Sequence, residues 1–365
     1  MNVIFACGGT GGHIFPAIAM AEELAMREKT KILFVGSENG MEKDIIKKFR
    51  FDFVSIPAKP LIRRFTIKNL QNFFSIIKAI FESGRIIKDF NPDFVIGTGG
   101  FVSFPMLAAA VLTKKKTLIH EPNVYPGIAN RILGTFVDRI TTGFEETKKY
   151  FPDNKTKVTG NPVRHSILKY DKNYGIKFFK LDKNRKTILI MPGSRAAKKI
   201  NDVVTLSLKK IEKEIKDVQI IWMTGKADYK KIKNVIKESK IKIRIYDFIF
   251  NSGVAYAAAD AAVLRAGAST LSEIVATATP SVLIPYPYAT DNHQEKNAAL
   301  FKKNKAAVVI KDDDLNENNL VAALKFLTNK RNNERIKKNI KKLNVKNGAK
   351  NIIDFITGDV KCKKE

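Results

Sequence analysis

The chain has 365 residues, 44% of them hydrophobic, which is more than one hydrophobic core usually serves and favours two domains. Its 65 lysines and arginines outnumber 36 aspartates and glutamates, and this formal charge of +29 fits an anionic membrane, a phosphorylated substrate or a nucleic acid. The cations are spread along the chain and no nucleic-acid-binding motif occurs, so nucleic acid is the least favoured partner.

Short apolar runs typical of strands alternate with helical patterns along the whole chain. The predicted strands are residues 2–6, 31–36, 93–97, 117–120, 139–142, 187–191, 218–224, 242–246, 261–264, 281–285 and 306–310. Strands separated by helices indicate βαβ units and parallel sheets. The expected fold is therefore α/β, with two Rossmann-like doubly wound domains facing a cleft, residues 1–163 and 164–342. A C-terminal helix within residues 343–365 is expected to pack back on the first domain.

The first predicted strand runs directly into the loop Gly8-Gly-Thr10-Gly11-Gly12-His13. A glycine turn between a strand and a helix lets a phosphate or a sugar approach backbone N–H groups at the positive end of the helix. His13 is the one side chain of this loop that titrates near neutral pH, which makes it the candidate general base. Nicotinamide binding is disfavoured, because the loop departs from G-x-G-x-x-G and the second strand ends at Gly36, although Glu38 follows it closely.

Other polar clusters favour structural interpretations. The triplet Asp312-Asp313-Asp314 lies between a strand and a predicted helix start near Asn316, where acids form a turn and a cap. The four histidines lack zinc-site spacing, so no metal site is predicted. With two cysteines, Cys7 and Cys362, in very different contexts, no disulfide is predicted either.

Five motifs together resemble the MurG family of glycosyltransferases. They are Gly8-Gly-Thr-Gly-Gly-His-Ile-Phe-Pro16, Gly97-Thr-Gly-Gly-Phe-Val-Ser-Phe-Pro105, His120-Glu-Pro-Asn123, Gly160-Asn-Pro-Val-Arg164 and Arg265-Ala-Gly-Ala-Ser-Thr-Leu-Ser-Glu273. The resemblance covers nearly the whole chain. It implies a GT-B fold and an inverting, metal-independent transfer of N-acetylglucosamine from UDP-GlcNAc to undecaprenyl-diphosphoryl-N-acetylmuramoyl-pentapeptide, with no cofactor.

The resemblance also implies which residues contact the donor: Thr10, Gly11, Gly12, Asn123, Arg164, Ser194, Ile249, Ala268, Ser269, Thr270, Leu271, Ser272, Glu273 and Gln294. Ile249 would act through its backbone. Without the resemblance, Thr270-Leu-Ser-Glu273 fits a capping box, in which Glu273 only satisfies a backbone N–H. The resemblance favours a carboxylate that accepts both ribose hydroxyls. It also points to His13 as the base, with His120 and Glu121 as alternatives.

Two positions depart from the family pattern. Ala196 stands where the family usually has a loop glycine, which puts the local conformation of that loop in doubt. Pro122 stands where the family commonly has glutamine, which puts any contact from that side chain in doubt.

Residues 59–88 carry seven cations against the single acid Glu82. They also contain an apolar stripe at helical spacing, made of Leu70, Phe73, Phe74, Ile77, Ile80 and Phe81. A basic helix with aromatic residues is typical of a membrane interface. Because most of the stripe is expected to pack on the sheet, the predicted membrane and acceptor contacts are Arg63, Arg64, Phe65, Lys68 and Ile76. The chain is thus expected to be a peripheral enzyme at the cytoplasmic membrane face. The alternatives are another GT-B enzyme that uses a UDP-sugar, such as a glycolipid synthase or a UDP-GlcNAc epimerase, and a basic binding protein on an inert scaffold.

Overall fold

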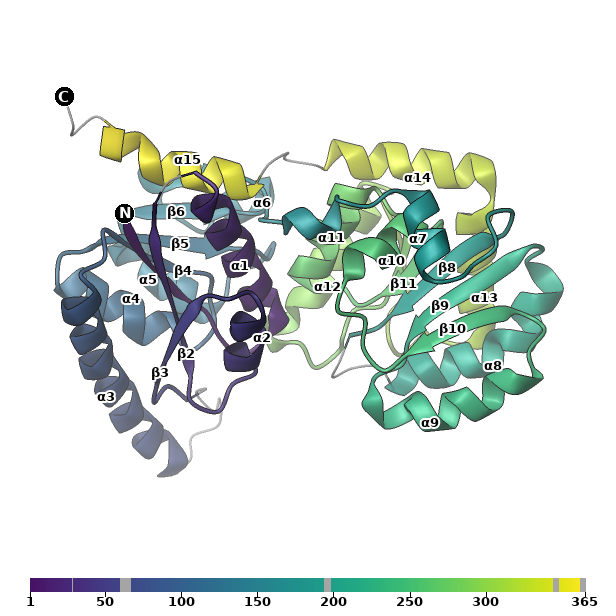
Figure 1. The fold of residues 1–365 in the computed structure, drawn as a ribbon, viewed down its shortest axis with the longest axis horizontal. Coiled ribbons are helices and arrows are strands. Elements are labelled where there is room, and N and C mark those ends of the chain that lie inside the picture. The colour runs from purple at the N-terminus through teal and green to yellow at the C-terminus, as the bar shows by residue number, and fades with distance from the viewer. Residues whose placement is uncertain (28, 60–66, 194–197, 344–347, 362–365) are drawn as a thin grey trace. The chain divides into compact units, whose positions relative to one another are not determined.

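The computed structural model describes residues 1–27, 29–59, 67–193, 198–343 and 348–361. The chain divides into two compact units, Met1–Arg164 with Val345–Glu365 (unit 1) and His165–Asn344 (unit 2) (Figure 1). Arg164, which the sequence analysis assigned to the second domain, therefore belongs to unit 1.

Unit 1 is built on a seven-stranded parallel sheet in the order β3-β2-β1-β4-β5-β6-β7. Its strands are β1 (Asn2–Ala6), β2 (Lys31–Ser37), β3 (Asp52–Ile56), β4 (Phe94–Gly97), β5 (Lys116–Glu121), β6 (Arg139–Thr142) and β7 (Thr156–Val158). Its helices are α1 (Gly11–Ala25), α2 (Glu42–Lys48), α3 (Ile67–Phe90), α4 (Ser103–Leu112), α5 (Ile128–Phe136), α6 (Glu145–Lys148) and α15 (Gly348–Lys361).

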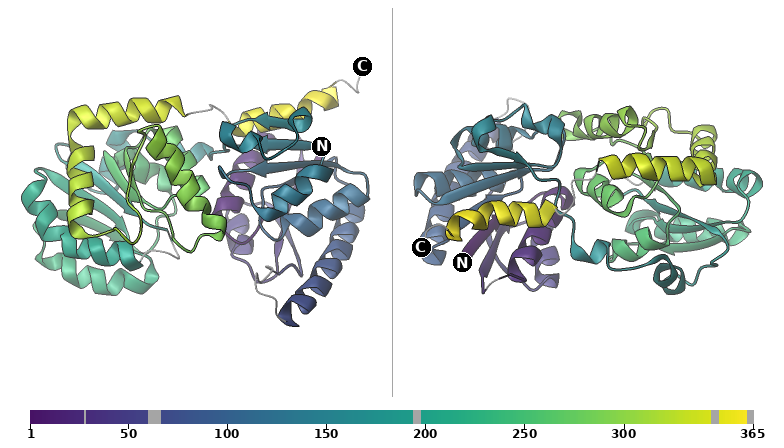
Figure 2. Two further views of the ribbon diagram at one scale, coloured as in Figure 1. Left: turned by 180° about the vertical axis from the view of Figure 1, so that it is seen from behind. Right: turned by 90° about the horizontal axis from the view of Figure 1, so that it is seen from above.

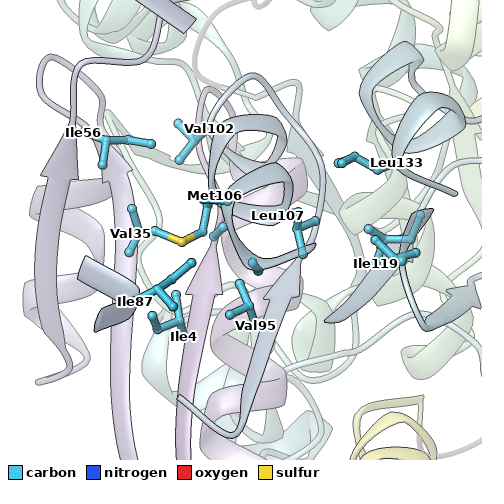
Figure 3. Close-up of a cluster of buried hydrophobic side chains, with 14 of the residues drawn as sticks. Ile4, Val35, Ile56, Ile87, Val95, Val102, Met106, Leu107, Ile119 and Leu133 are labelled. Atoms are coloured by element: carbon cyan, nitrogen blue, oxygen red, sulfur yellow. The ribbon is translucent and has the colours of Figure 1, made fainter. Parts of the chain in front are cut away.

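Alternation along the central strands supplies both faces of this sheet with apolar side chains. Ile4 and Val95 contribute to one buried cluster, together with residues of α3, α4 and α5 (Figure 3). Phe5 and Phe34 contribute to the opposite cluster with α1, α2 and α15. The helix after β1 therefore covers one face of the sheet, and the helix after β4 covers the other.

The C-terminal helix α15 is an integral part of unit 1. It packs beside α1 (Figure 2), and its residues Ile352, Ile353 and Ile356 are almost completely buried. The last helix of the chain thus completes the core that the first strand begins.

Unit 2 repeats this winding with a six-stranded parallel sheet in the order β10-β9-β8-β11-β12-β13. Its strands are β8 (Lys186–Met191), β9 (Val218–Met223), β10 (Lys242–Tyr246), β11 (Ala261–Leu264), β12 (Ser281–Leu283) and β13 (Val308–Val309). Its helices are α7 (Lys172–Phe178), α8 (Lys198–Glu214), α9 (Lys226–Val235), α10 (Ser252–Ala258), α11 (Ala268–Thr277), α12 (His293–Lys303), α13 (Glu317–Thr328) and α14 (Lys330–Lys342).

Each sheet has a switch point where the strand order reverses, between β1 and β4 in unit 1 and between β8 and β11 in unit 2. In open α/β sheets, ligands bind beyond the carboxyl ends of the strands at such a point. The glycine motifs singled out in the sequence occupy these positions, since residues 98–100 follow β4 and residues 265–267 connect β11 to α11.

Candidate active site

His13 lies in the first turn of α1, at the switch point of unit 1, and its side chain is half-buried. Its Nδ1 is 2.8 Å from the carbonyl oxygen of Thr98, and the Thr98 hydroxyl in turn donates to the carbonyl of His13 at 2.7 Å. A carbonyl can only accept, so Nδ1 carries the proton and Nε2 keeps its lone pair. Burial lowers the pKa of His13, against a smaller opposing effect of the Thr98 carbonyl. The imidazole is therefore neutral and oriented at neutral pH, as a general base must be.

The glycines after β4 give the His13 ring its space. A Cβ on Gly99 would lie 2.9 Å from Cε1 and Nδ1 of His13, and a Cβ on Gly100 would lie 2.5 Å from the carbonyl oxygen of Gly8. Both glycines also have positive φ, +97° and +84°, which other residues rarely adopt. The motif at residues 97–100 thus leaves the space that the imidazole occupies. This role could not be predicted from the sequence, because it depends on contact between loops that are distant in the chain.

His120 and Glu121, the two alternatives for the base, are engaged elsewhere. The Nε2 of His120 is 3.0 Å from Asn161 Oδ1, and its Nδ1 is 3.1 Å from Thr141 Oγ1. Because His120 is completely buried, its pKa falls to about 4, against the raising effect of the bond to Asn161. The ring has no nitrogen left to take a proton from a substrate.

Glu121 organises the loop that follows β5. Its carboxylate accepts hydrogen bonds from the backbone and side chain of Asn123, the backbone of Gly127 and the side chain of Asn130. Burial raises the pKa of Glu121, and these four bonds oppose the rise. Asn123, a predicted donor contact, is thus held by Glu121 in unit 1. Pro122 contributes its carbonyl, which accepts from Asn161 Nδ2 at 2.9 Å.

Thr10 and Arg164 also lie beside α1. Thr10 is the exposed N-cap residue of this helix, although its side chain makes no cap hydrogen bond, and Gly11 and Gly12 form the first helical positions. The Arg164 guanidinium lies over the ring of Phe15, with 4.4 Å between Cζ and the ring centroid. A buried cation therefore accompanies the glycine loop within unit 1.

In unit 2, the start of helix α11 excludes the capping box considered for Thr270 and Glu273. The helix begins at Ala268 with Gly267 as N-cap, so Thr270 already lies inside the helix and cannot be the cap. Of the predicted donor contacts, Ser269, Thr270 and Glu273 are half-buried. In contrast, the side chains of Ala268, Leu271 and Ser272 are buried in unit 2, and the Ser272 hydroxyl donates to the carbonyl of Ala268.

Two further predicted donor contacts lie close to this helix or to β10. Gln294 accepts from the backbone N–H of Tyr286, and its Nε2 would lie 4.0 Å from a Cβ on Gly267. Ile249, which follows β10, is 8% exposed, so its side chain is not available to a ligand. Ser194 and Ala196 lie outside the described residues.

The structure tests the apolar stripe of α3, whereas most of the predicted membrane contacts stay predictions. Arg63, Arg64 and Phe65 lie outside the described residues, and Lys68 lies in α3 among residues whose side chains are not described. Ile76 is half-buried, whereas Phe74, Ile77 and Phe81 of the stripe expected to pack on the sheet are 64%, 38% and 73% exposed. Ile80 contacts the core together with Ala79 and Ile87, so the buried face of α3 is rotated away from the predicted stripe.

Helix α5 adds an exposed apolar row that the sequence analysis missed. Ile128, Ile132 and Phe136, spaced four residues apart, are 44%, 48% and 63% exposed. This spacing was visible in the sequence, but it fits a buried stripe equally well.

Two Rossmann-like units, each with ligand loops at its switch point, define an α/β fold of the GT-B type, and models of two glycosyltransferase domains match the chain. The glycosyltransferase family 28 N-terminal domain matches residues 3–142, and the corresponding C-terminal domain matches residues 187–354.

Curated relatives agree over nearly the full length. A "UDP-N-acetylglucosamine--N-acetylmuramyl-(pentapeptide) pyrophosphoryl-undecaprenol N-acetylglucosamine transferase" from Desulforamulus reducens is 41% identical over 98% of each chain, and one of the same name from Halothermothrix orenii is 40% identical over 93% of this chain and 92% of its own. The crystal structure of MurG from Acinetobacter baumannii matches with 26% identity and a TM-score of 0.77, over 98% of this chain and 99% of its own. The chain belongs to this MurG family and is a glycosyltransferase.

We predict that Gly99→Ala lowers turnover by roughly 10²-fold. The new Cβ would lie 2.9 Å from the His13 ring and would displace it, and proton transfer is sensitive to such a small misplacement of the base. The measurement is steady-state kinetics. Gly225→Ala is the matched control, because Gly225 also has positive φ, +77°, but no atom within 4 Å of its Cβ position. Equal losses in both variants would mean that backbone strain alone causes the effect.

Proposed function

We propose that the chain transfers N-acetylglucosamine from UDP-GlcNAc to the C4 hydroxyl of undecaprenyl-diphosphoryl-N-acetylmuramoyl-pentapeptide, with inversion at the anomeric carbon. Its relatives are named for this donor and for a muramoyl acceptor of this kind. The observation that carries the proposal is the neutral, oriented imidazole of His13 on the glycine loop of unit 1.

The reaction requires one proton transfer and one exchange of bonds. The acceptor oxygen forms a bond to C1 of N-acetylglucosamine while the bond from C1 to the β-phosphate oxygen breaks, and the acceptor proton passes to Nε2 of His13. UDP leaves with the electrons of the broken bond. The hydrogen bond from Nδ1 to Thr98 stabilises the imidazolium ion that this step creates.

On the donor side, we propose that Glu273 binds the ribose hydroxyls and Gln294 the sugar hydroxyls. Glu273 Oε1 lies 3.4 Å from the Ser252 hydroxyl, which helps to set its position. The N-terminus of α11 directs backbone N–H groups outward, and such a helix end stabilises the charge that grows on a leaving diphosphate. We therefore propose that transfer proceeds without a metal ion.

We expect UDP release that requires both UDP-GlcNAc and the muramoyl lipid, and that persists at an undiminished rate in excess EDTA, because protein dipoles offset the leaving-group charge. A coupled UDP assay measures this. A UDP-GlcNAc epimerase would convert the donor without the acceptor, which chromatography of the sugar nucleotide would detect. Activity that is lost in EDTA and returns only with Mg²⁺ or Mn²⁺ would contradict metal-independent transfer.

His13→Ala should lower turnover by roughly 10²–10⁴-fold with little change in donor affinity. In the wild type, turnover should fall as the pH drops through the pKa of His13, below the ordinary value of 6.5, because a protonated imidazole cannot accept a proton. This acidic limb should be absent in the variant. Rate profiles between pH 5 and 8 test both points, and a normal limb in His13→Ala would assign the base elsewhere.

We also propose that unit 1 binds an anionic membrane peripherally through α3, α4 and α5. None of the helices in the described part of the chain combines the length and apolar character needed to cross a bilayer. Helices α3 and α5 expose the apolar rows described above, and the last residue of α4, Leu112, is 74% exposed. Exposed cations accompany these helices: Lys78, Arg85, Lys88, Lys114 and Arg131. Apolar side chains among cations favour an anionic lipid interface.

Replacement of Phe74 and Phe81 together by serine should weaken binding to vesicles that contain anionic lipid by about tenfold or more, because two exposed aromatic side chains no longer enter the interface. Vesicle sedimentation at two salt concentrations measures this. Leu206→Ser, at a site 63% exposed on α8 of unit 2, is the control and should bind as the wild type does. Unchanged binding of the double variant would place the lipid contact on another surface.

A further inference from the structure

The acidic triplet after β13 does not form the helix cap that the sequence analysis expected. The N-cap of α13 is Asn316, whose side chain accepts from the backbone N–H of Asn319 at 3.0 Å. Asp313 is 95% exposed at its side chain, whereas the side chain of Asp312 is only 11% exposed. A nearly buried carboxylate in an otherwise solvated turn requires a partner of opposite charge.

That partner is Arg265, the first residue after β11. Arg265 is 7% exposed, and its Nη1 lies 2.5 Å from Oδ1 of Asp312. The same nitrogen also donates to the carbonyls of Ile284 and Pro285, at 3.3 and 3.2 Å, at the end of β12. The carboxyl ends of β11 and β12 are thus joined through one guanidinium, and Asp312 adds the segment after β13.

A second cation reaches the other oxygen of the same carboxylate. Nζ of Lys199 lies 3.3 Å from Oδ2 of Asp312, and Lys199 is the second residue of α8. Asp312 therefore contacts both elements at the switch point of unit 2, the start of α8 and the segment that leads into α11. Because both carboxylate oxygens face cations, this arrangement does not favour a bound metal ion.

We propose that Asp312 is a positioning residue for the nucleotide donor. This role rests on the proposed function, because UDP-GlcNAc is the ligand proposed for unit 2. Asp312 neutralises Arg265 and, through it and Lys199, sets the spacing between the start of α8 and residues 265–273. Asp312 does not touch the donor itself. Without the charge of Asp312, the buried guanidinium keeps its backbone acceptors but loses its counterion, and residues 265–267, which lead into α11, shift with it.

The experiment compares Asp312→Asn with Asp313→Asn, which alters a neighbouring carboxylate also near Lys199, at 3.8 Å, but exposed. The dissociation constant of UDP is measured by calorimetry, and kcat and KM are measured for each substrate. Asp312→Asn should raise the UDP dissociation constant and the KM for UDP-GlcNAc by roughly 10- to 100-fold, with the acceptor KM within about twofold of the wild type. Asp313→Asn should match the wild type.

A merely structural role would give a different result, in which Asp312→Asn raises both KM values together or leaves UDP binding unchanged, and either outcome overturns the proposal. If Asp312→Asn does not fold, Lys199→Met decides, because it leaves the pair of Asp312 with Arg265 intact. A selective rise in donor KM in Lys199→Met supports the proposal, and an unchanged donor KM overturns it. If the wild type itself fails to bind UDP, the proposed function fails, which is a distinct result.

Discussion

The hydrogen bond from His13 Nδ1 to the Thr98 carbonyl connects the two loops on which the candidate active site of unit 1 depends. The two loops meet because β1 and β4 are neighbours at the point where the strand order reverses. The helices that follow these two strands lie on opposite faces of the sheet. The carboxyl ends of the strands therefore remain uncovered, and a ligand can bind there. One contact thus fixes the tautomer of the imidazole, its orientation and the separation of the loops. It also requires glycine at position 99, because a Cβ would occupy the place of the ring.

Unit 2 has the same strand winding, but at its switch point an ion pair connects the segments that follow the strands. There the buried Arg265 and Asp312 replace the imidazole and the carbonyl as the connection between strand ends. The His13 imidazole is neutral, so a neutral carbonyl can hold it, whereas the buried Arg265 guanidinium keeps its charge and requires a counterion.

Local sequence patterns predicted the central strands, and the two strands of unit 1 that they missed, β3 and β7, share one position in the sheet. Both β3 and β7 are edges of the sheet, where one side faces solvent and a continuous apolar run is unnecessary. Val54 in β3, for example, is 39% exposed. The stripe in α3 shows the opposite error. Its periodicity correctly predicted a helix, but Phe74 and Phe81 are exposed although they are spaced like core residues.

The sequence by itself determined the two doubly wound domains, the family, and the loops and residue types of the candidate site, because strand and glycine motifs are local and five of them occur in the family's order. Only the tertiary structure decided which polar groups meet. His13 finds Thr98 across 85 residues, and Arg265 finds Asp312 across 47. The start of α11 at Ala268 was likewise decided there, and it excludes the capping box for Glu273. The strength of these contacts depends on burial and on atomic distance, and both arise only when the sheets assemble.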